Sequence, residues 1–161
     1  MLAIVRATLS RLDEVEPLWL ALHAHHAVVG APVAPVRPPA ESGSRRRAQC
    51  AEWLTSGTAV LLLAEEEQPV GYLVLRVEDG PPTWAVGDRV AEIETLSVLP
   101  QARSRGVGKA LMAAAREAAR EMRATNLSVG LVHTNEAARR FYEREGFRPF
   151  YLSLLATVKE G

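Results

Sequence analysis

The chain has 161 residues, which suits a single domain and is ample for a buried core. Hydrophobic residues make up 48% of it, a share that excludes a disordered chain. Nineteen basic residues balance nineteen acidic ones, so no overall charge draws the protein toward nucleic acid or an anionic membrane surface.

No sequence feature predicts a membrane-bound or secreted protein. The longest strictly apolar run, 59–64, is far too short to span a bilayer, and the N-terminus lacks the pattern of a secretory signal. The single cysteine, Cys50, excludes an internal disulfide. We therefore expect one cytoplasmic domain over 1–161, without membrane or nucleic-acid partners.

The N-terminal part predicts a strand followed by a helix. Residues 2–8 are apolar and partly β-branched, which favours a strand. Ser10 or Asp13 can cap the next helix. Pro17 fits the first turn of a helix capped at Asp13 better than the interior of one capped at Ser10.

A proline-rich segment, 30–44, separates this helix from the next and predicts a long surface loop. A second helix is expected over 45–55. Two apolar runs, 58–64 and 70–77, flank a polar turn and predict a hairpin. The prolines and glycines of 78–87 predict a second surface loop.

Strands and helices alternate in the rest of the chain. The order of elements is therefore β-α-α-β-β-β-α-β-α-β, which predicts an α/β fold with a mixed sheet and helices on both faces. The remaining strands are expected over 92–98, 127–133 and 147–158, with helices over 107–123 and 135–146 between them.

The turn after strand 92–98 is rich in glycine and arginine, because residues 103–108 read R-S-R-G-V-G. Glycines allow unusual turn conformations and let a ligand approach the backbone. The first amides of a helix lack internal partners and form the positive end of its dipole, so this turn predicts a phosphate site. Arg103, Arg105 and Lys109 add positive charge. The glycines alone would equally fit an ordinary strand-to-helix turn, and the spacing matches neither common nucleotide fingerprint.

A second motif follows over 134–147, which reads T-N-E-A-A-R-R-F-Y-E-R-E-G-F. Together with R-x-R-G-x-G it resembles the GNAT superfamily of N-acetyltransferases, whose members carry N-x-x-A-x-x-x-Y-x-x-x-G-F after their fifth strand. The resemblance covers the whole chain and is strongest over 92–147. The matching positions are Asn135, Ala138, Tyr142, Gly146 and Phe147.

This resemblance implies a mostly antiparallel mixed sheet whose fourth and fifth strands splay apart, with acetyl-CoA bound in the cleft between them and no metal. By the same likeness, Asn135 contacts the pantetheine arm, and Tyr142 points its hydroxyl at the thioester sulfur. The backbone of Leu96, Ser97 and Val98 pairs with the pantetheine arm, and the amides of Ser104, Arg105, Gly106, Val107, Gly108 and Lys109 hold the pyrophosphate beside Arg103.

The chemistry of acyl transfer asks for an acid and a base. An alkylamine with a pKa of ~10.4 is neutral in only about one molecule in 2500 at pH 7, so a base assists its attack. Glu92 and Glu94 lie two apart on one strand and face the same way if that strand is regular. The histone-acetylating branch of the family has its base at the position of Glu92, which makes Glu92 the first candidate and Glu94 the second. Gly130 stands where the branch that acetylates ribosomal protein N-termini has a Glu, which argues against that branch's mechanism.

Each candidate also has a structural interpretation. Asn135 could serve as a helix N-cap, and Tyr142 as a core aromatic. Glu92 and Glu94 could form a solvated strand edge or pair with an arginine. Three histidines, His23, His25 and His26, suggest a metal site, but no acidic residue or cysteine is spaced to complete it.

The sequence thus predicts an N-acetyltransferase that uses acetyl-CoA and a primary amine, either a small molecule or a protein lysine or N-terminus. A non-catalytic acyl-CoA-binding module of the same fold is the alternative. The first two helices, the proline-rich loop and the loop over 78–89 should shape the acceptor pocket. The final strand, 147–158, could lend an edge to a homodimer.

Overall fold

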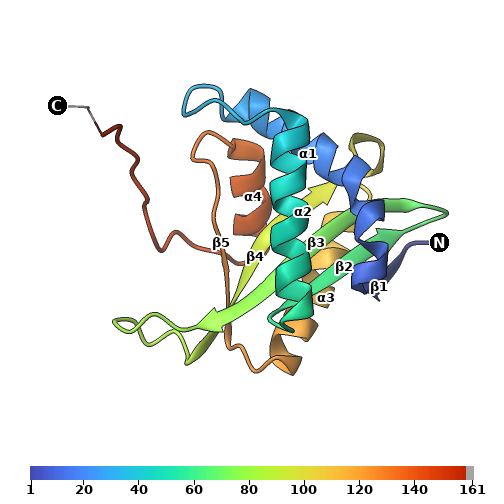
Figure 1. Cartoon of the computed structure of the whole chain (residues 1–161). Helices are drawn as coiled ribbons and strands as arrows, with labels where there is room; N and C mark the ends of the chain where they lie inside the picture. Colours follow the sequence, from blue (N-terminus) through green and yellow to red (C-terminus); the bar gives the residue numbers. More distant parts are fainter. Residues whose placement is uncertain (159–161) are drawn as a thin grey trace.

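A computed structural model describes residues 1–158 of the chain. One β-sheet lies between helices on its two faces (Figure 1). The elements in chain order are β1 (Ala3–Ala7), the 3-10 helix η1 (Leu9–Val15), α1 (Glu16–Val29), α2 (Pro39–Thr55), β2 (Ala59–Glu65), β3 (Pro69–Asp79), β4 (Arg89–Val98), the 3-10 helix η2 (Pro100–Ala102), α3 (Val107–Glu121), β5 (Asn126–Val129) and α4 (Glu136–Arg144).

The five strands lie in the order β1-β2-β3-β4-β5. Neighbours pair antiparallel from β1 to β4, and β5 runs parallel to β4. The sheet is therefore mixed and mostly antiparallel, as predicted. The hairpin predicted over 58–77 is formed by β2 and β3.

Each face of the sheet has its own apolar core. On one face Leu73 and Leu75 pack with Leu111 and Met112 of α3. On the other face Leu61 and Tyr72 pack with residues of η1, α1 and α2. The continuous apolar run of β2 follows from this burial on both sides. Figure 1 shows α1 and α2 in front of the sheet and α3 behind it, which confirms helices on both faces.

Two boundaries predicted in the first half are wrong. The chain enters its first helix through η1, and Asp13 binds Arg47 instead of capping a helix. Pro17 does lie in the first turn of α1, as predicted. The second helix begins at Pro39 and not at Arg45. The N–H of a first helical residue has no partner within the helix, so a proline, which lacks this N–H, loses nothing at that position.

The C-terminal part departs most from the prediction. β5 ends at Val129 and not at His133, and 147–158 forms no strand. A strand requires a neighbour to pair with, and this segment leaves the body of the domain after α4 (Figure 1). Its side chains from Phe150 to Val158 are exposed. Within residues 1–158, no helix combines the length and the hydropathy needed to cross a membrane.

Candidate active site

The free edge of β4 is the first part of the site. β5 pairs with β4 only as far as Ile93, opposite Val129, so the last five residues of β4 have no neighbour on that side within the described chain. Leu99 donates its amide to Val70 of the β3 side at 2.9 Å. Because alternate residues of an antiparallel strand point their polar groups to opposite edges, Leu96 and Val98 present theirs to the gap. The expected splay between the fourth and fifth strands is confirmed.

A bulge in β4 helps to open this gap. The register with β3 shifts between Val74 and Leu75, which leaves Glu94 as the extra residue of β4. Such a bulge bends its strand and increases its twist, and bulges are frequent beside active sites. Arg103 then fixes the end of the strand, because its Nε donates to the carbonyl oxygen of Val98 at 3.0 Å.

The turn before α3 exposes a row of unpaired amides. Gly106 has φ +82°, a left-handed conformation that favours glycine, and Ser104 has φ +59°. The first helical bond runs from the Ala110 amide to the Gly106 carbonyl at 2.9 Å. The amides of 104–109 have neither a backbone acceptor nor a capping side chain within residues 1–158. These N–H groups lie at the positive end of α3, as an anion site requires.

The two sequence motifs meet at Gly108. A Cβ at this position would lie 3.2 Å from the ring of Phe141 in α4. Glycine therefore lets the first turn of α3 pack closely against α4. Arg105 forms an ion pair with Glu66 of the β2–β3 turn, whereas Lys109 has no acidic partner among the described residues.

Asn135 and Tyr142 anchor the second motif. The side-chain oxygen of Asn135 accepts a hydrogen bond from the Ala138 amide at 3.2 Å, so Asn135 is the N-cap of α4. Tyr142 is buried, with its ring edge-to-face against Phe141 and Phe147 at 5.1 and 5.3 Å. Burial raises the pKa of the Tyr142 hydroxyl, which therefore stays protonated and able to donate.

The two glutamates share one face of the sheet but differ in environment. Arg76 lies opposite Glu92 in the register and donates to Glu94 at 2.5 Å, while it also pairs with Glu78 and covers the Trp53 ring. Glu94 is thus held in an ion pair. Burial, and then the charges of Glu94 and Glu78, raise the pKa of Glu92, which makes Glu92 a better proton acceptor near neutral pH.

The glutamates and the tyrosine lie on opposite faces of the sheet. Tyr142 belongs to the core beside α3, whereas Arg76 and its glutamates face the Trp53 side, under α2. Groups on the two faces can act on one molecule only through the gap beside β4. A glutamate can therefore still act as the base and Tyr142 as the acid, although neither Glu92 nor Glu94 contacts Tyr142 directly.

A family model matches the part of the chain that holds this site. The model of the acetyltransferase (GNAT) family matches residues 32–147, which is more than half of the chain. The chain belongs to the GNAT family. Members of this family are generally acetyl-CoA-dependent acetyltransferases.

Solved structures share the GNAT fold at low sequence identity. A GCN5-related N-acetyltransferase from Ralstonia eutropha has 21% identity and a TM-score of 0.77, with 98% of this chain and 99% of that chain covered. A predicted acetyltransferase from Clostridium acetobutylicum, solved with acetyl-CoA, has 17% identity and a TM-score of 0.75, with 96% of each chain covered. An aminoglycoside antibiotic 6′-N-acetyltransferase from Acinetobacter baumannii has 16% identity and a TM-score of 0.73, with both chains fully covered. A search of curated protein sequences gave no match.

One of the three histidines, His23, has a structural explanation in this GNAT protein. His23 is buried, its Nε2 lies 2.8 Å from the carbonyl oxygen of Arg37, and its ring packs on Trp19. His23 therefore fastens the proline-rich loop to α1. Within residues 1–158, no group of three or more His, Cys, Asp or Glu side chains is arranged to hold a metal ion.

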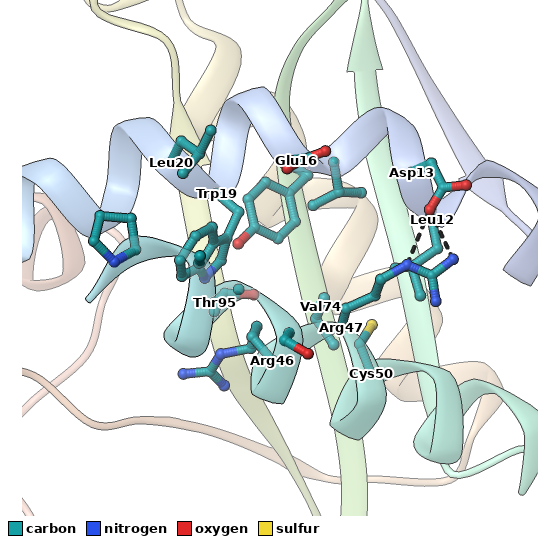
Figure 2. A pocket seen from close by; sticks show the side chains of 16 residues that line it. Leu12, Asp13, Glu16, Trp19, Leu20, Arg46, Arg47, Cys50, Val74 and Thr95 are labelled. Atoms are coloured by element: carbon teal, nitrogen blue, oxygen red, sulfur yellow. Dashed lines mark hydrogen bonds and ion pairs between the residues drawn. The ribbon is translucent and has the colours of Figure 1, made fainter. Parts of the chain in front are cut away.

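Sequence reasoning missed some residues around the site. Arg76, which pairs with Glu94 and not with Glu92, was a detectable signal, because it is the only charged residue in the otherwise apolar stretch 69–77 of β3. Tyr72 and Thr95 were also missed. They line a cavity between η1, α1 and α2 above the sheet (Figure 2).

Proposed function

We propose that this protein is an acetyl-CoA-dependent N-acetyltransferase that moves an acetyl group to a primary amine by direct attack. The observation that supports this most is the row of unpaired amides at 104–109, which lies next to the free edge of β4. A phosphate chain suits the first feature, because it needs N–H donors and positive charge. An extended amide-containing arm suits the second, because it can pair with a strand edge.

The binding residues follow from these two features. The amides of 104–109 hold the pyrophosphate, with added charge from Arg103, Arg105 and Lys109. The backbone of 96–98 pairs with the pantetheine arm. Asn135 keeps α4 in place as its cap and turns its remaining amide hydrogens toward the same arm.

In the proposed reaction, the amine nitrogen attacks the thioester carbonyl, the new C–N bond forms and the C–S bond breaks. Glu92 accepts the proton that the amine loses, directly or through water. Tyr142 donates its proton to the leaving thiolate, whose ordinary pKa is about 8.5, and the phenolate regains a proton from water as the product leaves. The free backbone amide near Val98 stabilises the negative charge that develops on the carbonyl oxygen.

An acyl-CoA-binding module without activity is the competing function. The two functions differ in turnover and not in coenzyme binding. A turnover assay separates them. It measures, through the free thiol, the coenzyme A that is released from acetyl-CoA in the presence of a panel of primary amines. Amine-dependent release that is lost in Tyr142→Phe supports the enzyme. Coenzyme A binding in calorimetry without release for any amine supports the module.

Two broader expectations belong with this proposal. A single buried Cys50 fits a reducing compartment, which supports a cytoplasmic location. The apolar segment 150–158 lies outside the domain body, which supports a homodimer in which this segment finds a partner.

A further inference from the structure

A second hollow lies apart from the proposed coenzyme cleft. It has a volume of about 370 Å³, in the range of small-molecule sites, and lies between η1, α1 and α2 with β3 and β4 as its floor (Figure 2). Its walls are mostly apolar and include Leu12, Trp19 and Val74. None of 96–98, 103–109, Asn135 and Tyr142 lines it. It touches the coenzyme cleft only through Thr95, the neighbour of Leu96 on β4.

Two buried hydroxyls on its floor have no hydrogen-bond partner other than each other among the described residues. Tyr72 is 1% exposed and Thr95 is 7% exposed, and neither side-chain oxygen bonds a described residue outside this pair. Thr95 is near enough to lower the pKa of Tyr72, but burial dominates and raises that pKa to about 12. Tyr72 therefore stays protonated. Since each hydroxyl can both donate and accept, the pair is ready for a polar group of a ligand.

A cation without an acidic partner lies beside these hydroxyls. On α2, Arg45 pairs with Glu41 and Arg47 pairs with Asp13. The residue between them, Arg46, lines the cavity and reaches only the Gln49 side chain, at 3.4 Å, among the described residues. Figure 2 shows Arg46 on the Trp19 side of the cavity and the Arg47–Asp13 pair on the other side. A free guanidinium of this kind binds a carboxylate strongly.

Arg46 lines the same cavity as Tyr72 and Thr95, so the anionic and the hydroxyl subsites belong to one site. A ligand that serves both must bear a carboxylate and a second polar group close together, with an apolar remainder for the walls. An α-amino acid with an apolar side chain has this form.

We propose that the acceptor of this acetyltransferase is an apolar α-amino acid, bound with its carboxylate on Arg46, its amine at the Tyr72 and Thr95 hydroxyls, and its side chain against Trp19. This inference rests on the proposed function. It places the nucleophilic nitrogen next to Thr95, one residue from the strand edge that faces the thioester. The bond changes are those given above, with nitrogen as the nucleophile.

The test compares L-phenylalanine with 2-phenylethylamine, which lacks the carboxylate. Titrations in the calorimeter use the whole protein saturated with coenzyme A. Wild type should bind L-phenylalanine about tenfold or more tightly than 2-phenylethylamine, because one charge-assisted hydrogen bond is lost with the carboxylate. Arg46→Gln should abolish this difference. Arg45→Gln, on the same helix but outside the cavity, should keep it.

The hydroxyl pair is tested with Tyr72→Phe. It should weaken the binding of both probes about tenfold, without lowering the Tm of the free protein, because the hydroxyl that it removes bonds no described residue except its neighbour Thr95. A lower Tm would assign this hydroxyl a structural role and overturn its part of the proposal.

The remaining outcomes separate this inference from the proposed function. If the protein binds coenzyme A and binds the two amines with equal affinity, the proposed acetyltransferase stands, but the amino acid is overturned as its acceptor. An equal loss in Arg45→Gln and Arg46→Gln overturns the role of Arg46. If the protein binds L-phenylalanine through Arg46 but takes up no coenzyme A, the cavity is supported as an amino-acid site and the acetyltransferase is overturned.

Discussion

At the scale of single residues, the two glutamates of β4 illustrate how one neighbour changes a role. Both carboxylates lie on the same face, but Arg76 binds Glu94 and leaves Glu92 without a cation of its own among the described residues. Burial and two nearby negative charges then raise the pKa of Glu92. A carboxylate with a raised pKa is a better proton acceptor near neutral pH.

Glu92→Gln should therefore lower kcat/KM at pH 7 by about 10²–10⁴-fold, the usual contribution of a general base. A carboxylate accepts a proton only when ionised, so wild-type kcat/KM should rise with pH through an apparent pKa above the ordinary ~4.3 of glutamate. This rise should be absent from the pH profile of the variant. Glu94→Gln serves as the control and should keep the rise. Identical profiles for wild type and Glu92→Gln would exclude Glu92 as the base.

Tyr142→Phe tests the acid. The ring contacts with Phe141 and Phe147 remain, so the Tm should change little. Without the hydroxyl, kcat should fall by about 10²-fold or more, because the thiolate leaves without its proton. Tyr151→Phe is the control, since Tyr151 is largely exposed outside the core. An unchanged kcat in Tyr142→Phe would leave Tyr142 with a packing role only.

At the scale of elements, the turn before α3 depends on one left-handed residue. Gly106→Ala should destabilise the fold by about 1–2 kcal/mol, the strain of an alanine at φ +82°. Gly57 offers a matched control in the α2–β2 turn, with φ +72° and open space around it, as at Gly106. Both variants should lose similar stability in urea unfolding, but only Gly106→Ala should weaken coenzyme A binding in calorimetry. Equal coenzyme affinity in the two variants would separate this turn from the coenzyme.

Local signals explain which elements could be predicted from the sequence. The strand–turn–helix around Gly106 and the N-cap at Asn135 depend on residues close in the chain, and both are found. The bulge at Glu94 could not be predicted, because it is set by the register with β3. The start of α2 at Pro39 was missed, because a proline that ends a loop and one that begins a helix look alike without structure.

The candidate site shows the same division. Its backbone features were predictable from two motifs, whereas the cavity over Tyr72 and Thr95 joins η1, α1, α2, β3 and β4 and has no local pattern. Hydroxyls inside apolar strands give only a weak signal, since most such groups are simply hydrogen-bonded in the core. Only the tertiary structure reveals that these two have no partner in the described core beyond each other.

At the scale of the whole molecule, the last described segment combines strong β propensity with high exposure. Leu152 and Leu154 are 79% and 85% exposed. Exposed apolar patches of this kind mark interaction surfaces. Within residues 1–158, β5 is an edge strand whose outer side is unpaired. One chain thus offers both an unpaired strand edge and an apolar segment able to pair, and a second copy supplies the complement of each.

We therefore expect a homodimer in solution, measured as twice the chain mass by size-exclusion chromatography with light scattering. The double variant Leu152→Asp with Leu154→Asp should be a monomer of unchanged Tm, because neither side chain packs in the core and buried charge opposes association. Val28→Asp places one charge on an exposed apolar position of α1 and should remain a dimer. A monomeric wild type, or a dimer that persists in the double variant, would exclude this segment as the interface.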